Sequence, residues 1–212
     1  MAVGAESFRK NSESGQATAT TILATRHIMD SFEKRTGSIE CEEITQCDFT
    51  NKKSFLKYML SGKFVNCFKL AGKWAPEALN AAREGLGTNG VDLPRETMSC
   101  ASEVVRQMGG NEEEMAMVAG FAGGLGLSGN GCGALAAAVW MNAMSYNRDN
   151  PGKAAPYDPE SNETLKVFYE ETDYEMMCDK ICGQRFSSPE DHTQFLKEGG
   201  CKKLIRVLSG AE

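Results

Sequence analysis

Apolar residues recur along the chain every three to four positions, and this period is typical of amphipathic α-helices. Cys100, Val104 and Met108, for example, are four residues apart, so they would share the buried face of one helix. No stretch shows the sustained alternation of apolar and polar residues that indicates a β-strand. The pattern predicts an all-α fold, a helical bundle with one glycine-rich loop.

Capping signals mark the ends of several predicted helices. Asn51 precedes an apolar-periodic stretch, and Asn111 with Glu114 has the spacing of a capping box. Residues 1–14 are polar, and for them we expect poor order. Beyond a proline-rich connector that starts near residue 145, the pattern predicts helices over residues 161–172, 175–183, 188–197 and 201–209.

The densest run of glycines separates an apolar helix from an alanine-rich helix, and it delivers Cys132 to the start of the second one. A helix start offers free backbone N–H groups and a partial positive charge, which both favour a thiolate. Cys132 is therefore expected to be reactive or to bind a metal. Residues 124–129 match the dinucleotide pattern G-x-G-x-x-G, but a helix precedes them, so we expect no nucleotide.

A faint internal repeat relates the two halves of the chain. Residues 28–49 align without a gap with residues 165–186, which places Cys41 over Cys178.

With small gaps the repeat continues until Cys67 meets Cys201. We interpret residues 1–88 as a truncated, degenerate copy of the cysteine module and residues 89–212 as the complete copy, packed as one globular unit. The loop over residues 85–94 is rich in Gly, Asn and Asp and is the expected boundary.

The overall composition is that of an ordinary globular protein, with 41% hydrophobic and 25% charged residues. A net charge of −6 provides no basic field for nucleic acid or an anionic membrane. No apolar run approaches the roughly 20 residues that span a bilayer, and the first residues lack the pattern of a signal peptide. We expect a cytoplasmic protein that binds neither nucleic acid nor membranes.

The chain contains eight cysteines and two histidines, His27 and His192. No two cysteines have the spacing C-x-x-C, which argues against a zinc finger, a thioredoxin motif and a haem attachment site. The roles that remain are metal ligands, reactive thiols and small core residues. The cysteines are Cys41, Cys47, Cys67, Cys100, Cys132, Cys178, Cys182 and Cys201.

Four cysteines of the second half resemble a family of redox proteins that is named C_GCAxxG_C_C after its own pattern. The matching positions are Cys100, the run Gly131-Cys132-Gly133-Ala134, then Cys178 and Cys201, while the closing glycine of the pattern is an alanine here. The resemblance implies an all-helical domain whose four cysteines gather at one redox site. A similar module in split-Soret cytochromes is associated with an iron–sulfur centre. No haem is expected here, because the chain has no haem attachment motif.

Two chemistries suit the four cysteines of the motif. They could hold a [2Fe–2S] or [4Fe–4S] centre for electron transfer, with Gly129, Gly131 and Gly133 letting the backbone approach the cofactor. They could instead form reversible dithiol/disulfide pairs, with Cys132 as the nucleophile of low pKa. A third hypothesis is a non-catalytic helical protein that binds a partner or forms a homodimer. The redox partner protein is not identified by the sequence.

The other cysteines are weaker candidates. For Cys41 and Cys67 we expect packing roles, because they lack the partners that the complete copy has. Cys182 follows Cys178 by one helical turn and could be a spare ligand or a resolving thiol.

Overall fold

The computed structural model describes residues 1–11, 13–87, 93–151 and 158–211. Within these ranges all regular secondary structure is helical, and β-type pairing is limited to one isolated bridge between Gly131 and Met177. The predicted all-α fold is confirmed. The helices are α1 (Ala2–Lys10), α2 (Ser14–Thr36), α3 (Cys41–Thr45), α4 (Lys52–Leu60), α5 (Val65–Leu86), α6 (Cys100–Gln107), α7 (Glu112–Val118), the 3-10 helix η1 (Ala119–Phe121), α8 (Gly133–Asp149), α9 (Pro159–Thr172), α10 (Cys178–Cys182), α11 (Pro189–Lys197) and α12 (Lys202–Ser209).

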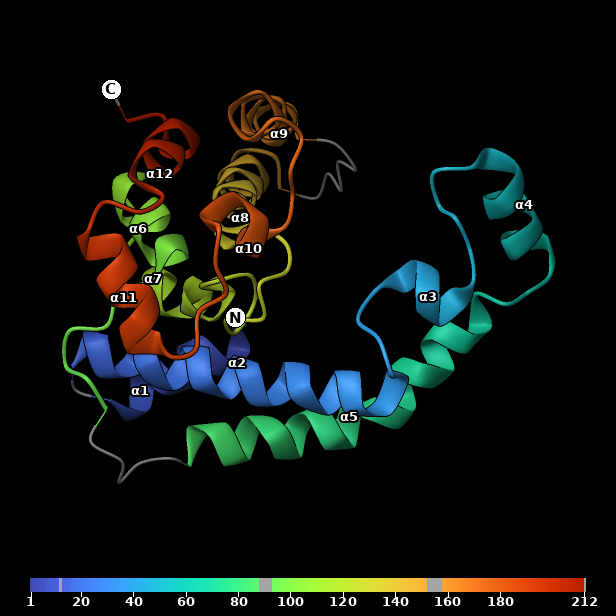
Figure 1. Cartoon of the computed structure of the whole chain (residues 1–212), viewed down its shortest axis with the longest axis horizontal. Coiled ribbons are helices and arrows are strands. Elements are labelled where there is room, and N and C mark those ends of the chain that lie inside the picture. The colour runs from blue at the N-terminus through green and yellow to red at the C-terminus, as the bar shows by residue number, and fades with distance from the viewer. Residues whose placement is uncertain (12, 88–92, 152–157, 212) are drawn as a thin grey trace.

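The long helices α2 and α5 lie side by side along one edge of the molecule (Figure 1). At one end of this pair, α6 to α12 form a compact body together with α1 and the first part of α2 (Figure 1). At the other end, α3, α4 and the first half of α5 project away from the body (Figure 1). We call this projection, residues 41–74, the arm.

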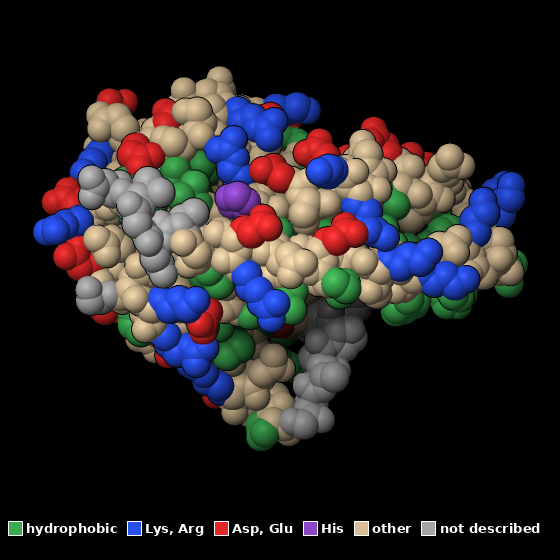
Figure 2. Space-filling model, turned by 90° about the horizontal axis from the view of Figure 1, so that it is seen from below, with side chains coloured by type: hydrophobic (Ala, Val, Ile, Leu, Met, Phe, Trp, Pro, Cys, Tyr) green, Lys and Arg blue, Asp and Glu red, His purple; other side chains and the backbone are tan. Residues whose placement is uncertain are grey.

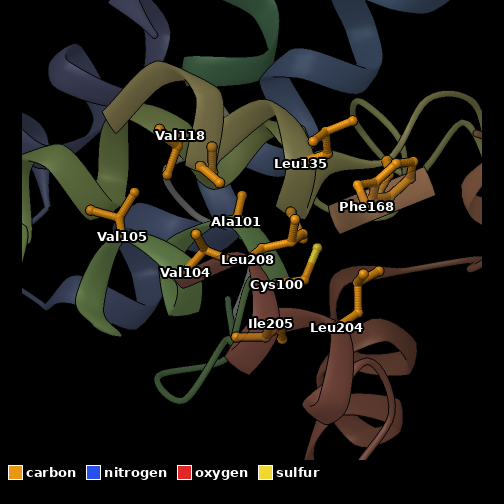
Figure 3. Packing of buried hydrophobic residues seen from close by; sticks show 14 of the residues in the cluster. Cys100, Ala101, Val104, Val105, Val118, Leu135, Phe168, Leu204, Ile205 and Leu208 are labelled. Carbon is orange, nitrogen blue, oxygen red and sulfur yellow. The ribbon is translucent and has the colours of Figure 1, made fainter. Parts of the chain in front are cut away.

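The main core of the body lies between α6, α8, α9 and α12. Val104 of α6 and Phe168 of α9 are fully buried, and Leu208 of α12 packs into the same cluster (Figure 3). Cys100 belongs to this cluster, with Leu135 of α8 nearby (Figure 3). A smaller cluster joins α2 to the start of α10; it consists of Ile22, Ala122, Leu127, Cys178 and Phe186. Cys100 and Cys178 are thus core residues by position.

The N-terminal segment is ordered into α1, so the expectation of poor order over residues 1–14 is wrong. Ser7 is fully buried, and its hydroxyl donates a hydrogen bond to the carbonyl of Ala17 at 2.9 Å. A β-carbon on Gly4 would lie 2.1 Å from the carbonyl oxygen of Ala116. Small residues therefore let α1 lie directly against α7, a contact that a hydrophobic pattern does not report.

The capping signals identified the observed helix starts. The Asn51 side chain accepts hydrogen bonds from the backbone N–H groups of Lys53 and Ser54. Asn111 and Glu114 form the reciprocal bonds of a capping box, with both distances at 2.9 Å. The four predicted C-terminal helices correspond to α9, α10, α11 and α12. Local sequence therefore determines where these helices begin.

Helices of the first half lie against helices of the second, since α1 packs on α7 and α2 packs on η1. The expected boundary over 85–94 contains residues 88–92, which lie outside the described residues. The division into a degenerate and a complete copy stays a prediction. Among the described helices, none is both long enough and apolar enough to cross a membrane.

Candidate functional site: a cluster of thiols

Three sulfur atoms meet where α10 faces the start of α12. The Sγ of Cys182 lies 3.9 Å from that of Cys178 and 3.6 Å from that of Cys201. Cys178 and Cys182 are the first and last residues of α10, so one turn of helix brings their side chains together. Cys201 is the residue before α12 and adopts φ 58°. Cys182 is therefore the central sulfur of the group.

Cys201 takes this position in a left-handed backbone conformation, which is uncommon for a residue with a β-carbon. It follows the pair Gly199–Gly200, in which Gly199 has φ 92°. A β-carbon on Gly200 would lie 2.3 Å from the Phe195 ring. The two glycines let the chain turn tightly from α11 into α12, and this turn carries the Cys201 sulfur toward α10.

Cys132 and Cys100 lie next to the group of three. Cys132 is the N-cap of α8, and the backbone N–H groups of Ala134 and Leu135 face its sulfur. Cys100 is the first residue of α6, and the N–H of Gly123 faces its sulfur. Burial raises the pKa of Cys100, and charge on Cys132 and on Cys182 raises it further, so these two sulfurs lie near enough to influence Cys100. Of the motif cysteines, Cys178 and Cys201 contact Cys182 directly, and Cys100 and Cys132 lie beside this group.

The glycine-rich loop holds this arrangement by backbone contacts. The N–H of Cys178 donates to the carbonyl of Asn130 at 2.7 Å, and the N–H of Asp179 donates to Gly129 at 2.9 Å. A β-carbon on Gly133 would lie 1.9 Å from the carbonyl oxygen of Phe121. Gly129 and Gly133 thus allow segments of the backbone to pack closely within the protein. A role of Gly129, Gly131 and Gly133 in binding a cofactor stays a prediction.

The pKa values of the thiols follow from burial and from their mutual hydrogen bonds. The thiols of Cys178 and Cys201 donate to Cys182, and this lowers the Cys182 pKa to about 4. The same contacts, together with burial, raise the pKa of Cys178 and of Cys201. Of the three thiols, Cys182 is therefore the one that is deprotonated first, and its negative charge is stabilised by the other two.

The expectation that Cys132 is the nucleophile of low pKa is wrong. Burial of Cys132 raises its pKa, and this effect outweighs the N–H groups of Leu135 and Ala134. Burial likewise raises the pKa of Cys100 to about 12. A helix start favours a thiolate only where water or other donors also reach the sulfur.

Access to the site is from the side of Cys201. Cys100, Cys132 and Cys178 are buried, whereas Cys182 and Cys201 are half-buried. A groove of about 560 Å³ runs past Cys201 between α9, α10 and α12. Glu170 and Asp173 line it on the α9 side, and Lys202 lines it on the α12 side. A molecule that reacts with the thiols would reach Cys201 and Cys182 before the other three.

His192 completes the polar surroundings. It is almost fully buried in α11, and its Nδ1 lies 3.3 Å from the carbonyl oxygen of Met98. Burial lowers its pKa, so the imidazole is mainly neutral at pH 7. Its ring packs edge-on against Phe186, with 4.9 Å between the ring centres. Any positive charge on this ring would further favour the Cys182 thiolate.

The donor set has the right chemistry for a soft metal ion. The two sulfur–sulfur distances are close to the ~3.8 Å between thiolates on one tetrahedral ion, given metal–sulfur bonds of about 2.3 Å. Throughout the described part of the chain, however, no three Cys, His, Asp or Glu side chains are grouped so that they could hold a metal ion. The side chains as arranged fit thiol chemistry better than they fit a metal centre.

Cys182 is the residue of the cluster that sequence reasoning undervalued. Its signal was its position four residues after Cys178, which puts both on one face of a helix. The second contact, to Cys201, depends on how α12 packs, and spacing cannot report it. Of the other cysteines, Cys47 is buried, whereas Cys41 and Cys67 are exposed, which does not fit the packing role expected for them.

Fold and site together define an all-helical protein with a cluster of five thiols at the meeting point of four helices. The family described as "Putative redox-active protein (C_GCAxxG_C_C)" matches residues 97–209, more than half of the chain. The chain belongs to this family of redox-active proteins. No curated protein and no solved structure matches it.

Proposed function

We propose that the protein is a thiol–disulfide redox protein in which Cys182 and Cys201 form the reactive pair. The observation that supports this most directly is the 3.6 Å between their sulfur atoms. Both side chains are half-buried and Cys201 lines an open groove, whereas the other three cysteines of the cluster are buried. The thiolate is the reactive form of cysteine, and a pKa of about 4 keeps Cys182 in that form at neutral pH.

The proposed reaction is the reduction of a partner disulfide. The Cys182 thiolate attacks one sulfur of that disulfide, a mixed disulfide forms, and the other partner sulfur leaves as a thiolate. This thiolate takes the proton of Cys201. The Cys201 sulfur then attacks Cys182, which closes the Cys182–Cys201 disulfide and releases the second partner sulfur as a thiolate. Two electrons pass from the protein to the partner, and the reverse sequence oxidises a partner dithiol.

The remaining cysteines support this pair. The Cys178 thiol donates to the Cys182 sulfur, so it stabilises the attacking thiolate and can stabilise it again as a leaving group. Cys178 itself is held by its backbone bond to Asn130. Cys100 and Cys132 line the buried side of the cluster, where they keep water away from the sulfurs.

Differential alkylation with mass spectrometry tests the proposal. The full chain is oxidised with a small aromatic disulfide, and the free thiols are then blocked and mapped. We expect a Cys182–Cys201 disulfide and loss of the mixed disulfide in Cys182→Ser. Cys67→Ser is the matched control, because it removes an exposed thiol outside the cluster and should change neither result. A disulfide confined to other pairs, or equal reactivity of Cys182→Ser, would refute the proposal.

An iron–sulfur centre held by Cys100, Cys132, Cys178 and Cys201 is the second candidate. It is favoured by the influence of Cys100 and Cys132 on the pKa values of Cys178 and Cys201, and by the N–H groups that face Cys100 and Cys132. Such a centre would supply one-electron transfer when bound. Protein purified without oxygen decides between the two. Stoichiometric iron and sulfide with a visible spectrum would favour the centre, whereas a colourless protein with a reversible Cys182–Cys201 disulfide would favour thiol exchange.

A further inference from the structure

The arm carries a concentration of positive charge that the net charge of the whole chain conceals. Between Asn51 and Trp74 the sequence contains six lysines and neither Asp nor Glu, although the complete chain has a net charge of −6. All six lysine residues are exposed. They are Lys52, Lys53, Lys57, Lys63, Lys69 and Lys73.

The same stretch of the arm exposes large apolar side chains. Leu60 is 79% exposed and Phe68 is 72% exposed. In the same α4–α5 region four further large apolar residues are exposed. They are Phe55, Leu56, Met59 and Val65. Contiguous exposed apolar patches of this kind mark interaction sites more often than isolated surface residues do.

The internal contacts of the arm fix which side of α4 faces outward. Tyr58 places its hydroxyl 3.0 Å from the Cys67 sulfur, and Ser54 places its hydroxyl 3.7 Å from the Cys47 sulfur. Both residues therefore point into the arm. Leu56 and Leu60 lie on the opposite side of the helix, away from these contacts. The apolar face of α4 is thus left without a partner from its own arm.

The arm also stands clear of the body. It occupies one extremity of the molecule (Figure 1), where basic side chains lie beside apolar ones along the projecting end (Figure 2). A β-carbon on Gly62 or Gly72 would meet no atom within 4 Å, so the surface around these glycines is open. A flat partner could reach this end without meeting the body.

We propose that the arm is a docking surface for an anionic membrane. Lysines interspersed with large aliphatic and aromatic side chains are the composition of helices that lie in a membrane interface. The ammonium groups of Lys52, Lys53 and Lys57 would contact lipid phosphates while Leu56 and Leu60 enter the acyl region. The charge on the arm complements that of anionic headgroups, and its apolar side chains match the region below them.

Two other occupants fit the same surface less well. A second copy docked arm to arm would bring two sets of six lysines together, and like charges oppose such contact. Single-stranded nucleic acid would neutralise the lysines and stack on Phe55 or Phe68. It would leave aliphatic side chains such as Leu60 uncovered. A lipid surface accounts for the charge and for the aliphatic side chains at once.

Sedimentation of the full-length protein with vesicles tests the proposal. We compare phosphatidylcholine vesicles with vesicles that also contain phosphatidylglycerol, and we expect binding to the second type that weakens at high salt. Each lysine near an anionic surface strengthens binding about fivefold, so K52E/K53E/K57E, which removes three lysines and adds three negative charges, should bind at least about 100-fold more weakly. We expect L56D/L60D to lose binding by at least tenfold. Lys166→Glu and Met144→Asp change an exposed lysine and an exposed methionine of the body and should bind as the unchanged protein does.

Several results would overturn the proposal. One is equal binding to both kinds of vesicle, and another is binding that the arm variants leave intact. If the protein ignores vesicles and forms dimers that the arm variants abolish, a second copy is the occupant. If single-stranded RNA binds to the arm and vesicles do not, the occupant is nucleic acid. Far-UV circular dichroism and thiol titration of the cluster establish that the variants are folded, since neither property depends on the arm surface.

Discussion

The arm and the segment around α10 and α11 begin with the same local structure. The helix α3 starts at Cys41 and α10 starts at Cys178, and both consist of five residues. Each ends in a left-handed residue, which is Gln46 in the arm and Gly183 in the body. Two stretches of different sequence therefore follow the same backbone course.

The agreement continues through the next helix. Asn51 caps the nine-residue α4, and Ser188 at the matching position caps the nine-residue α11. Phe49 packs against the rings of α4 as Phe186 packs against the rings of α11. The helical register places Tyr58 of α4 at the position that Phe195 has in α11.

What differs between the two segments is what packs against them. Phe186 is 3% exposed because it lies in a cluster with Ile22 and Leu127, whereas Phe49 is 45% exposed. The arm has Thr45 where the body has the central sulfur of Cys182. Local sequence is therefore sufficient to form the same pair of helices in both places, α3 with α4 and α10 with α11. A thiol cluster requires, in addition, the glycine-rich loop and α12 as neighbours.

The largest effect should be on the pH dependence of Cys182. In the unchanged protein its alkylation rate should be nearly constant between about pH 5.5 and about pH 8, since its pKa is about 4. In Cys178→Ala/Cys201→Ala both donors are lost and the pKa should return toward about 8.5, so the rate should rise about 200-fold over that range. Mass spectrometry with iodoacetamide measures both profiles. A flat profile in the double variant would show that the two neighbouring thiols do not control Cys182.

The matched phenylalanines should differ strongly in their contribution to stability. Phe186→Ala removes a buried ring and should lower the free energy of unfolding by about 3–5 kcal/mol. Phe49→Ala removes a half-exposed ring and should cost about 1 kcal/mol or less. Urea unfolding measures both. Equal losses would mean that something covers Phe49 in solution as completely as the body covers Phe186.

The two helix caps should contribute equally to the free energy of unfolding, because each depends on hydrogen bonds within its own helix. Asn51 accepts two backbone N–H groups at the start of α4, and Ser188 accepts that of Asp191 in α11. Replacing either by Ala should cost about 1 kcal/mol. Hydrogen exchange should locate the loss in α4 for Asn51→Ala and in α11 for Ser188→Ala. A loss spread over the whole body in Asn51→Ala would contradict a locally stabilised arm.

The smallest effect should appear at the left-handed residues. Gln46 has φ 55°, a conformation in which a β-carbon is unfavourable, so Gln46→Gly should stabilise the arm by about 0.5–1 kcal/mol. Gly183 has φ 69°, and Gly183→Ala should destabilise the body by about 1 kcal/mol. Thermal unfolding of the two variants should show shifts of opposite sign. Shifts of the same sign would mean that local backbone strain is not the deciding term.

Much of the fold could be predicted because it depends on local chemistry. Capping residues such as Asn51 and Asn111 identified helix starts, and the apolar period identified α9 to α12. The order in α1 could not be predicted, since it depends on how closely Gly4 approaches Ala116 in another helix. A hydrophobic pattern reports large buried side chains, and α1 is held by small ones.

The same division applies to the site. Of the four cysteines that the motif named, Cys178 and Cys201 both contact Cys182 in the structure. A single redox site made by all four stays a prediction. The motif could not predict the pKa of Cys132, because burial is a property of the packed protein. It also could not predict that Cys182 is central, because the Cys201 sulfur comes from a different helix. The net charge of the whole chain likewise could not report the positive charge of the arm, because it averages over both.

The tight turn before α12 has a mechanical consequence for oxidation. A disulfide bond would draw the sulfurs of Cys182 and Cys201 from 3.6 Å to about 2.05 Å. Backbone bonds anchor the α10 end of this pair to the glycine-rich loop, so the displacement should fall on the Gly199–Gly200 side. Because Leu204 and Ile205 join α12 to the main core, that movement reaches the interior directly. Oxidation of Cys182 and Cys201 should therefore change the packing of the main core of the body.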